Sequence, residues 1–129
     1  MNKVIRMTEE IWNLPACTGD LHNSGNYCAM GKLALALGMS VPDSELDGPG
    51  EVAVWSTMCQ LLTSSGNVWQ LNDKDPLESI NDVRRANPVN HELAIREGIE
   101  QLVAQGYILE TDDTVSKELA RLKACAEVV

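Results

Sequence analysis

The segment Tyr27–Met39 (YCAMGKLALALGM) constrains the fold more than any other, because it is apolar on almost every side. Its only charged residue is Lys32. A helix that is apolar all round belongs in a protein interior or in a membrane, and about 11 residues are too few to cross a bilayer, which takes about 20. Asn26 can cap such a helix and Gly38 can end it. The segment therefore predicts a buried central helix over about residues 27–38.

The length of 129 residues indicates a single globular domain, residues 1–129. A chain of this size buries roughly two thirds of the surface that its unfolded form exposes, so it can fold without disulfides or metals. Apolar residues make up 44% and charged residues 22%, which is close to ordinary globular composition and argues against wholesale disorder.

Helix-start and helix-stop signals predict further helices around the central one. They are expected from Thr8 to before Pro15, from near Glu51 to Gly66, over 76–85, from Asn87 to about Gln105, and from Asp112 onward. In the second of these, the expected buried stripe is Val52, Trp55, Met58, Cys59 and Leu62. Extended segments are expected at 1–7, 67–72 and 107–110, and loops at 15–26 and 39–50. The predicted fold class is mainly α: one compact domain of four to five helices around the central one, with two or three short extended segments.

The charge balance favours a protein partner over nucleic acid. Lys and Arg number 10 against 19 Asp and Glu, a net charge of −9, and such a surface repels phosphate backbones. The charge either keeps the protein soluble or forms an acidic face that docks on a basic partner, including a basic nucleic-acid channel. The candidate partner-binding residues lie in two segments: Asp43, Glu45, Asp47 and Glu51 in the first, and Asp73, Asp75, Glu78 and Asp82 in the second.

Each acidic segment also has a simpler interpretation. Residues 43–48 copy the first half of an EF-hand calcium loop, but position 12, which should be a bidentate Glu, is Val54. A solvated acidic loop explains this segment better. Turn and helix-start chemistry explains the acids at 73–82 equally well. We therefore expect no cofactor or metal.

Cys28 is the candidate nucleophile, because a thiol at a helix N-terminus has a lowered pKa. A thiol-dependent hydrolase or transferase would need a base beside it, and His22 is the nearest histidine in the sequence. His91 is expected in the first turn of a helix, whereas a papain-like base lies on a strand. The alternative interpretation is that Cys28 is a small apolar core residue.

Cys17, His22 and Cys28 are the candidate metal ligands, since zinc accepts thiolate and imidazole. Structural zinc sites usually need four ligands, and the fourth would have to be Cys59 or His91, both distant in the sequence. The alternative is an ordinary loop. The cysteines form no C-x-x-C pair, and the N-terminal segment has no apolar run like that of a signal peptide. We therefore expect reduced thiols in a cytoplasmic protein.

The segment 91–110 also resembles the recognition helix and the start of the wing in a winged-helix domain. Its expected exposed side carries Glu92, Glu97 and Glu100 with only Arg96 positive, which opposes DNA binding. A winged-helix-like module that binds something else stays an alternative. The chain contains no P-loop, H-E-x-x-H or G-x-S-x-G motif, so the common nucleotide-binding, zinc-protease and serine-hydrolase classes have no support.

Two motifs carry a resemblance to a known family: Cys28-Ala29-Met30-Gly31 followed by Leu33, and Trp69 followed by Leu71-Asn72-Asp73. With the amphipathic helix at 90–105, they resemble a family of small uncharacterised bacterial and phage domains. Its members carry a Cys-Ala-x-Gly-Ala-Leu helix and a later Trp-Asn-Asp segment. Lys32 here replaces the family's small residue. The resemblance spans about residues 26–106 and implies a bacterial or phage intracellular origin.

The leading hypothesis is a small acidic protein that acts by binding a protein partner with a basic surface. A phage or mobile-element origin would make a host-directed or anti-defence inhibitor the natural role. The alternatives are the thiol enzyme that uses Cys28 and a zinc-stabilised or winged-helix-like binding module.

Overall fold

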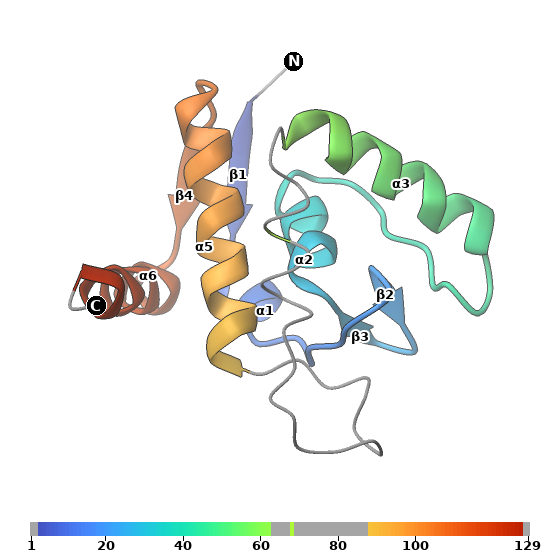
Figure 1. Cartoon of the computed structure of the whole chain (residues 1–129), viewed down its shortest axis with the longest axis horizontal. Coiled ribbons are helices and arrows are strands. Elements are labelled where there is room, and N and C mark those ends of the chain that lie inside the picture. Colours follow the sequence, from blue (N-terminus) through green and yellow to red (C-terminus); the bar gives the residue numbers. More distant parts are fainter. Residues whose placement is uncertain (1–2, 63–67, 69–87, 128–129) are drawn as a thin grey trace.

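A computed structural model describes residues 3–62, 68 and 88–127 of the chain. These residues form five helices and two two-stranded sheets (Figure 1), which confirms the mainly α class. The helix expected at 76–85 and the second acidic segment lie outside the described residues. Of the extended segment expected at 67–72, only Val68 is described, and it is buried. None of the helices in the described ranges is long and apolar enough to cross a membrane.

The elements follow one another from a short N-terminal strand to a long C-terminal helix. Their bounds are β1 (Val4–Met7), α1 (Glu9–Trp12), β2 (His22–Asn23), β3 (Asn26–Tyr27), α2 (Ala29–Ala36), α3 (Gly48–Leu61), α5 (Pro88–Ala104), β4 (Ile108–Thr111) and α6 (Asp113–Glu127). Helix α2 lies between α5 and α3 in Figure 1 and contacts both. Most of its length is buried: Ala29, Met30, Gly31, Lys32, Leu33, Ala34 and Ala36.

Local signals in the sequence placed most helix ends correctly. Thr8 caps α1 by accepting a hydrogen bond from the Ile11 amide at 3.3 Å. Asp112 caps α6 through the Val115 amide at 3.0 Å, and its second oxygen accepts the Glu9 amide of α1 at 2.6 Å. Gly38 follows α2 with a φ of +87°, a value that suits glycine at a helix end. These signals work because capping depends on residues only a few positions apart.

The predicted cap of α2 was wrong. Cys28 caps the helix, and its sulfur accepts a hydrogen bond from the Gly31 amide at 3.4 Å. Asn26 instead lies in β3. The chain stays extended through Tyr27 because that residue pairs with the segment after α1: its amide donates to Pro15 and its carbonyl accepts from Cys17, at 2.8 Å and 3.1 Å.

Two segments expected to be loops contain regular structure. Residues 15–26 hold the β2–β3 hairpin, in which His22 pairs with Tyr27. Its two turn residues, Ser24 and Gly25, have φ values of +50° and +87°, as a two-residue hairpin turn requires. Residues 39–50 hold the start of α3, which begins at Gly48 and not at Glu51. Pro49 does not exclude a helix there, because the first turn of a helix tolerates proline.

Strands β1 and β4 pair in parallel and connect the N-terminal segment with the chain between α5 and α6. Val4 lies opposite Ile108 and Met7 opposite Thr111. Both strands were expected as extended segments, but their pairing across more than 100 residues was not. Ile5 and Met7 of β1 are buried, and β1 contacts α2. The sheet therefore contributes its inner side to the same core as α2.

The start of β2 lies directly against α2 at a glycine. A Cβ atom on Gly31 would collide with the backbone carbonyl of Leu21, which cannot move away without displacing the hairpin. At Gly98 in α5, an added Cβ would meet the side chain of Leu33, and the clash would be with one methyl group at its flexible end. The two glycines therefore differ in what a methyl group would disturb.

We expect Gly31→Ala to lower the free energy of unfolding by about 2 kcal/mol or more, as overpacking against rigid backbone does. Gly98→Ala is the matched control: the gain in helix propensity, up to about 1 kcal/mol, offsets the shift of Leu33. Urea unfolding followed by circular dichroism measures both. Equal stability of the two variants would contradict the close contact between α2 and Leu21.

Candidate functional site

The first acidic segment is held against the β2–β3 hairpin by its own carboxylates. Asp43 accepts hydrogen bonds from the amides of Ser24 and Glu45, each at 3.0 Å. The Ser44 amide donates to the His22 carbonyl at 2.9 Å. Glu45 accepts the Ser24 hydroxyl at 3.4 Å and remains exposed. The loop therefore has a defined position on the hairpin turn.

Asp47 and Glu51 continue this pattern at the start of α3. Asp47 caps the helix through the Gly50 amide at 3.0 Å. Glu51 accepts the Leu21 amide at 2.6 Å and so ties α3 to the beginning of β2. The structure thus brings together all four candidate residues of the first segment. Three of them accept a hydrogen bond from a backbone amide.

Glu51 lies near enough to Asp20 and Asp43 to interact with them electrostatically. Burial raises the pKa of Glu51, and the charges of Asp20 and Asp43 raise it further, against the Leu21 hydrogen bond and His22. Burial and then the charge of Asp43 raise the pKa of Tyr27. We define the acidic surface as Asp20, Asp43, Glu45, Asp47 and Glu51.

Sequence reasoning missed Asp20, which is separated from Asp43 by the whole of α2 and joins the acidic surface only in the fold. One signal was available in the sequence. From Met7 to Leu62 the chain has seven Asp and Glu residues, and its only Lys or Arg is Lys32. Because Lys32 is buried, that stretch offers the acidic surface no exposed Lys or Arg.

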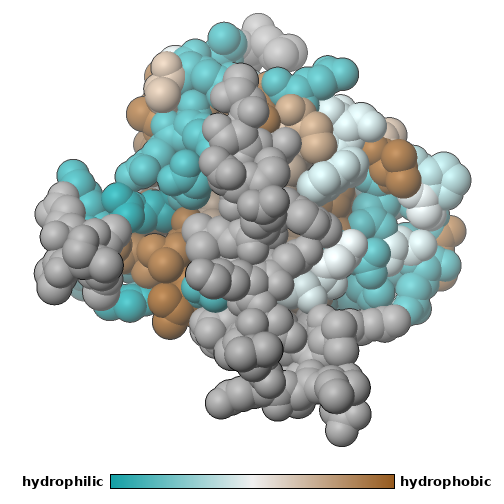
Figure 2. All heavy atoms as spheres, viewed as in Figure 1, coloured by the Kyte–Doolittle hydropathy of each residue, from teal (hydrophilic) through white to brown (hydrophobic). Residues whose placement is uncertain are grey.

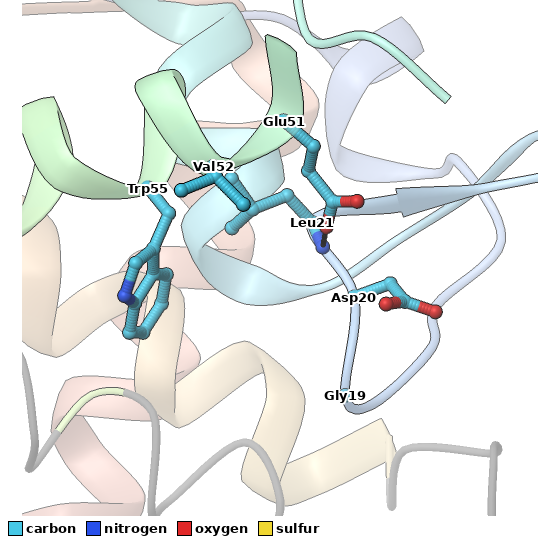
Figure 3. Close-up of a pocket in the computed structure, with 6 residues that line it drawn as sticks. All are labelled: Gly19, Asp20, Leu21, Glu51, Val52 and Trp55. Atoms are coloured by element: carbon cyan, nitrogen blue, oxygen red, sulfur yellow. Dashed lines mark hydrogen bonds between the residues drawn. The ribbon is translucent and has the colours of Figure 1, made fainter. Parts of the chain in front are cut away.

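A pocket of about 260 Å³ opens beside the acidic surface. Its lining is Gly19, Asp20, Leu21, Glu51, Val52 and Trp55. Figure 3 shows the Trp55 indole on one side and the backbone of residues 19–21 on the other, with the Glu51 carboxylate at Leu21. Val52, expected in the buried stripe of α3, is 62% exposed, whereas Met58 of the same stripe is buried. Pocket and acidic surface share Asp20 and Glu51.

A second hollow, of about 450 Å³, lies between α5, β4 and α6. Its lining is largely apolar and includes Ile99, Val103, Leu109 and Leu119. Figure 2 shows apolar side chains gathered where α6 meets the rest of the molecule, and others over α3. Arg96, Glu100 and Lys123 also line the hollow, and Arg96 and Glu100 form an ion pair with each other.

Cys28, the candidate thiol, and His22, its candidate base, have separate structural roles. Cys28 is 0% exposed and caps α2. In His22, Nε2 accepts the Gly25 amide at 3.2 Å, so the proton is assigned to Nδ1, which faces the Val41 carbonyl at 2.8 Å. The ring also stacks on Tyr27 with centroids 4.2 Å apart. His22 thus stabilises the hairpin and is not arranged as a base for Cys28.

The candidate zinc ligands are not assembled into a site. The thiol of Cys17 donates to the Asp20 carbonyl at 3.3 Å, and His22 and Cys28 have the contacts described above. Within the described ranges, no three His, Cys, Asp or Glu side chains are grouped to hold one metal ion.

The winged-helix interpretation is wrong in its topology. After α5 the chain enters β4, which pairs in parallel with β1 and leads into α6. A wing is an antiparallel hairpin, and this connection cannot form one. On α5, Arg96 forms an ion pair with Glu100 at 2.8 Å, which further reduces the positive charge that DNA would need.

Lys32 is a charged residue within the apolar helix α2. It is 2% exposed, and its ammonium donates to the Trp12 carbonyl in the last turn of α1 at 2.8 Å. Burial lowers its pKa to about 8, against the charges of Glu92, Cys17 and Cys28, which raise it. His91 is also buried, and burial together with the charge of Lys32 lowers its pKa to about 3.

The Lys32 ammonium affects the stability of the fold, but it cannot reach a substrate. An amine with a lowered pKa is a good nucleophile, yet Lys32 has almost no contact with solvent. The acidic surface with its pocket is therefore the candidate functional site.

Comparison of the chain with models of protein families, with curated proteins and with solved structures found no match.

We expect the buried ammonium of Lys32 to make stability depend on alkaline pH. The unfolded chain keeps the ordinary pKa of 10.5 while the folded protein loses its proton near pH 8, so the unfolded state binds more protons between these values and stability rises with pH. Relative to Lys32→Met, the free energy of unfolding of the wild type should rise by up to roughly 3 kcal/mol across this pH range. Urea unfolding of both proteins at several pH values measures this rise. A stability difference between them that stays constant with pH would contradict the prediction.

We expect Cys28 and Cys17 to react slowly with iodoacetamide near neutral pH, because both are buried, whereas the partly exposed Cys59 should react first. Peptide mass spectrometry resolves each cysteine, and denaturant should remove the difference. Labelling of Cys28 ahead of Cys59 in the folded protein would revive the thiol-enzyme hypothesis.

Proposed function

We propose that the protein acts by binding a protein partner that presents a basic surface, and that the acidic surface makes the contact. The observation that carries the proposal is the way these carboxylates are held. Asp43, Asp47 and Glu51 each accept a backbone amide and so keep fixed positions on the hairpin and α3. Groups that are already ordered lose little conformational freedom on binding.

The electrostatics support a cationic partner. Burial is the main reason that the pKa of Glu51 is raised, and the like charges of Asp20 and Asp43 raise it further. A cation placed among these carboxylates would relieve that repulsion. Complementary charge also accelerates the encounter and selects between partners.

Exposed apolar residues beside the acids supply the rest of an interface. Leu46, between Glu45 and Asp47 in the sequence, is 87% exposed, and Val52 directly follows Glu51. Protein interfaces combine an apolar centre with a polar rim. A purely electrostatic contact would not need these side chains.

Inhibition is the role that this chemistry favours. A protein that binds nucleic acid through a basic channel would be blocked by an acidic surface that occupies the channel. The host-directed or anti-defence role implied by the sequence resemblance would work in this way, in the cytoplasm of the host cell.

The test uses a synthetic peptide of four Lys-Arg repeats, with a Gln-substituted peptide as the uncharged reference. The variant Asp20→Asn/Glu45→Gln/Glu51→Gln removes three charges and keeps hydrogen-bond acceptors in place. The matched control, Glu100→Gln/Glu110→Gln/Glu118→Gln, removes the same charge from α5, β4 and α6, where each residue makes a surface ion pair.

We expect the first variant to weaken binding about tenfold, since each of the three charges contributes a few tenths of a kcal/mol or more, and the control to change it much less. Fluorescence anisotropy at low and high salt measures the affinity, which should fall with salt. Equal loss in both variants would mean that only net charge matters and would refute a defined acidic surface.

A further inference from the structure

The pocket beside the acidic surface has walls of two different kinds. The Trp55 indole forms one side, and the opposite side is the backbone of residues 19–21 with the Glu51 side chain across it (Figure 3). Trp55 is half-buried, and it lines the pocket. The pocket is therefore flat and aromatic on one side and negatively charged on the other.

We propose that this pocket receives one arginine side chain of the partner, stacked on Trp55 and paired with Glu51. The inference rests on the proposed function and identifies where within it one partner residue binds. A guanidinium group is planar, stacks on aromatic faces and carries several N–H donors, one of which can bind the carboxylate oxygen that the Leu21 amide does not occupy. These properties match both walls of the pocket.

Other occupants fit less well. An apolar side chain would take further water from Glu51, whose charged form burial already disfavours. An anion would meet Asp20 and Glu51 directly. A lysine ammonium satisfies the charge, but it is a compact and strongly hydrated group that cannot stack its head on an indole as a guanidinium does.

The contact between Glu51 and Leu21 prepares the site. The Leu21 amide donates to one carboxylate oxygen of Glu51 at 2.6 Å, which fixes the side chain across the pocket. Figure 3 shows the other oxygen directed away from Leu21, which leaves it for a further donor. Leu21 itself is buried and anchored on α2, so the position of Glu51 does not depend on a ligand.

The probes are three blocked amino acids: N-acetyl-arginine methylamide, its neutral isostere N-acetyl-citrulline methylamide, and the lysine equivalent. Binding is followed through the Trp55 indole N–H signal in NMR spectra, assigned with Trp55→Phe. We expect the arginine probe to move this signal in a saturable way, with the citrulline probe at least fivefold weaker and the lysine probe weaker than arginine.

Glu51→Gln should weaken the arginine probe about fivefold or more, because Gln keeps an acceptor for the Leu21 amide but removes the charge. Glu100→Gln on α5 is the matched control and should change nothing. Citrulline binding equal to arginine, lysine binding as tight as arginine, or an unmoved Trp55 signal would each overturn the inference.

The peptide experiment separates this inference from the proposed function. If the Lys-Arg peptide binds with salt dependence while the Trp55 signal stays unmoved, the arginine pocket is refuted and the acidic surface stands. If the arginine probe binds but the peptide does not, the pocket stands and the partner-binding function fails.

Discussion

The fixed position of the Leu21 backbone, between α2 and α3, is the constraint on which the candidate site depends. Its carbonyl accepts the Cys28 amide at 3.3 Å and lies over Gly31, while its amide donates to Glu51. Both polar groups of one residue therefore connect two helices. Because Glu51 is held by this link, Asp20 and Glu51 come together, and the pocket forms between Leu21 and Trp55.

The acidic residues stabilise the fold in this arrangement, and that role explains how the proposed binding role is possible. Carboxylates that accept backbone amides replace the hydrogen bonds that a turn would otherwise make to water. Asp43 and Asp47 do this for the hairpin turn and for the start of α3. The fold thus holds negative charges near one another at some electrostatic cost, which a cationic partner would reduce.

The residues around α2 show which features the sequence could predict. The apolar run predicted a buried helix, and Gly38 predicted its end, because burial and helix ends leave local signals. No local signal in the sequence indicates the β1–β4 pairing or the approach of Asp20 to Glu51, since each of these contacts joins residues from separate elements. The hairpin was missed because two-residue strands are too short to show a period. Lys32 was correctly seen as the one charge, but its pairing with Trp12 depends on where α1 packs.

The central claim is that the acidic surface concentrates charge for a cationic partner, and the titration of Glu51 tests it most directly. The Leu21 amide reports this carboxyl group, so NMR spectra across acidic pH follow its pKa with and without the Lys-Arg peptide. In the free protein the pKa should lie above the ordinary value of 4.5, and the peptide should lower it, because a nearby cation favours the charged form. A pKa of Glu51 that the bound peptide leaves unchanged would contradict the account.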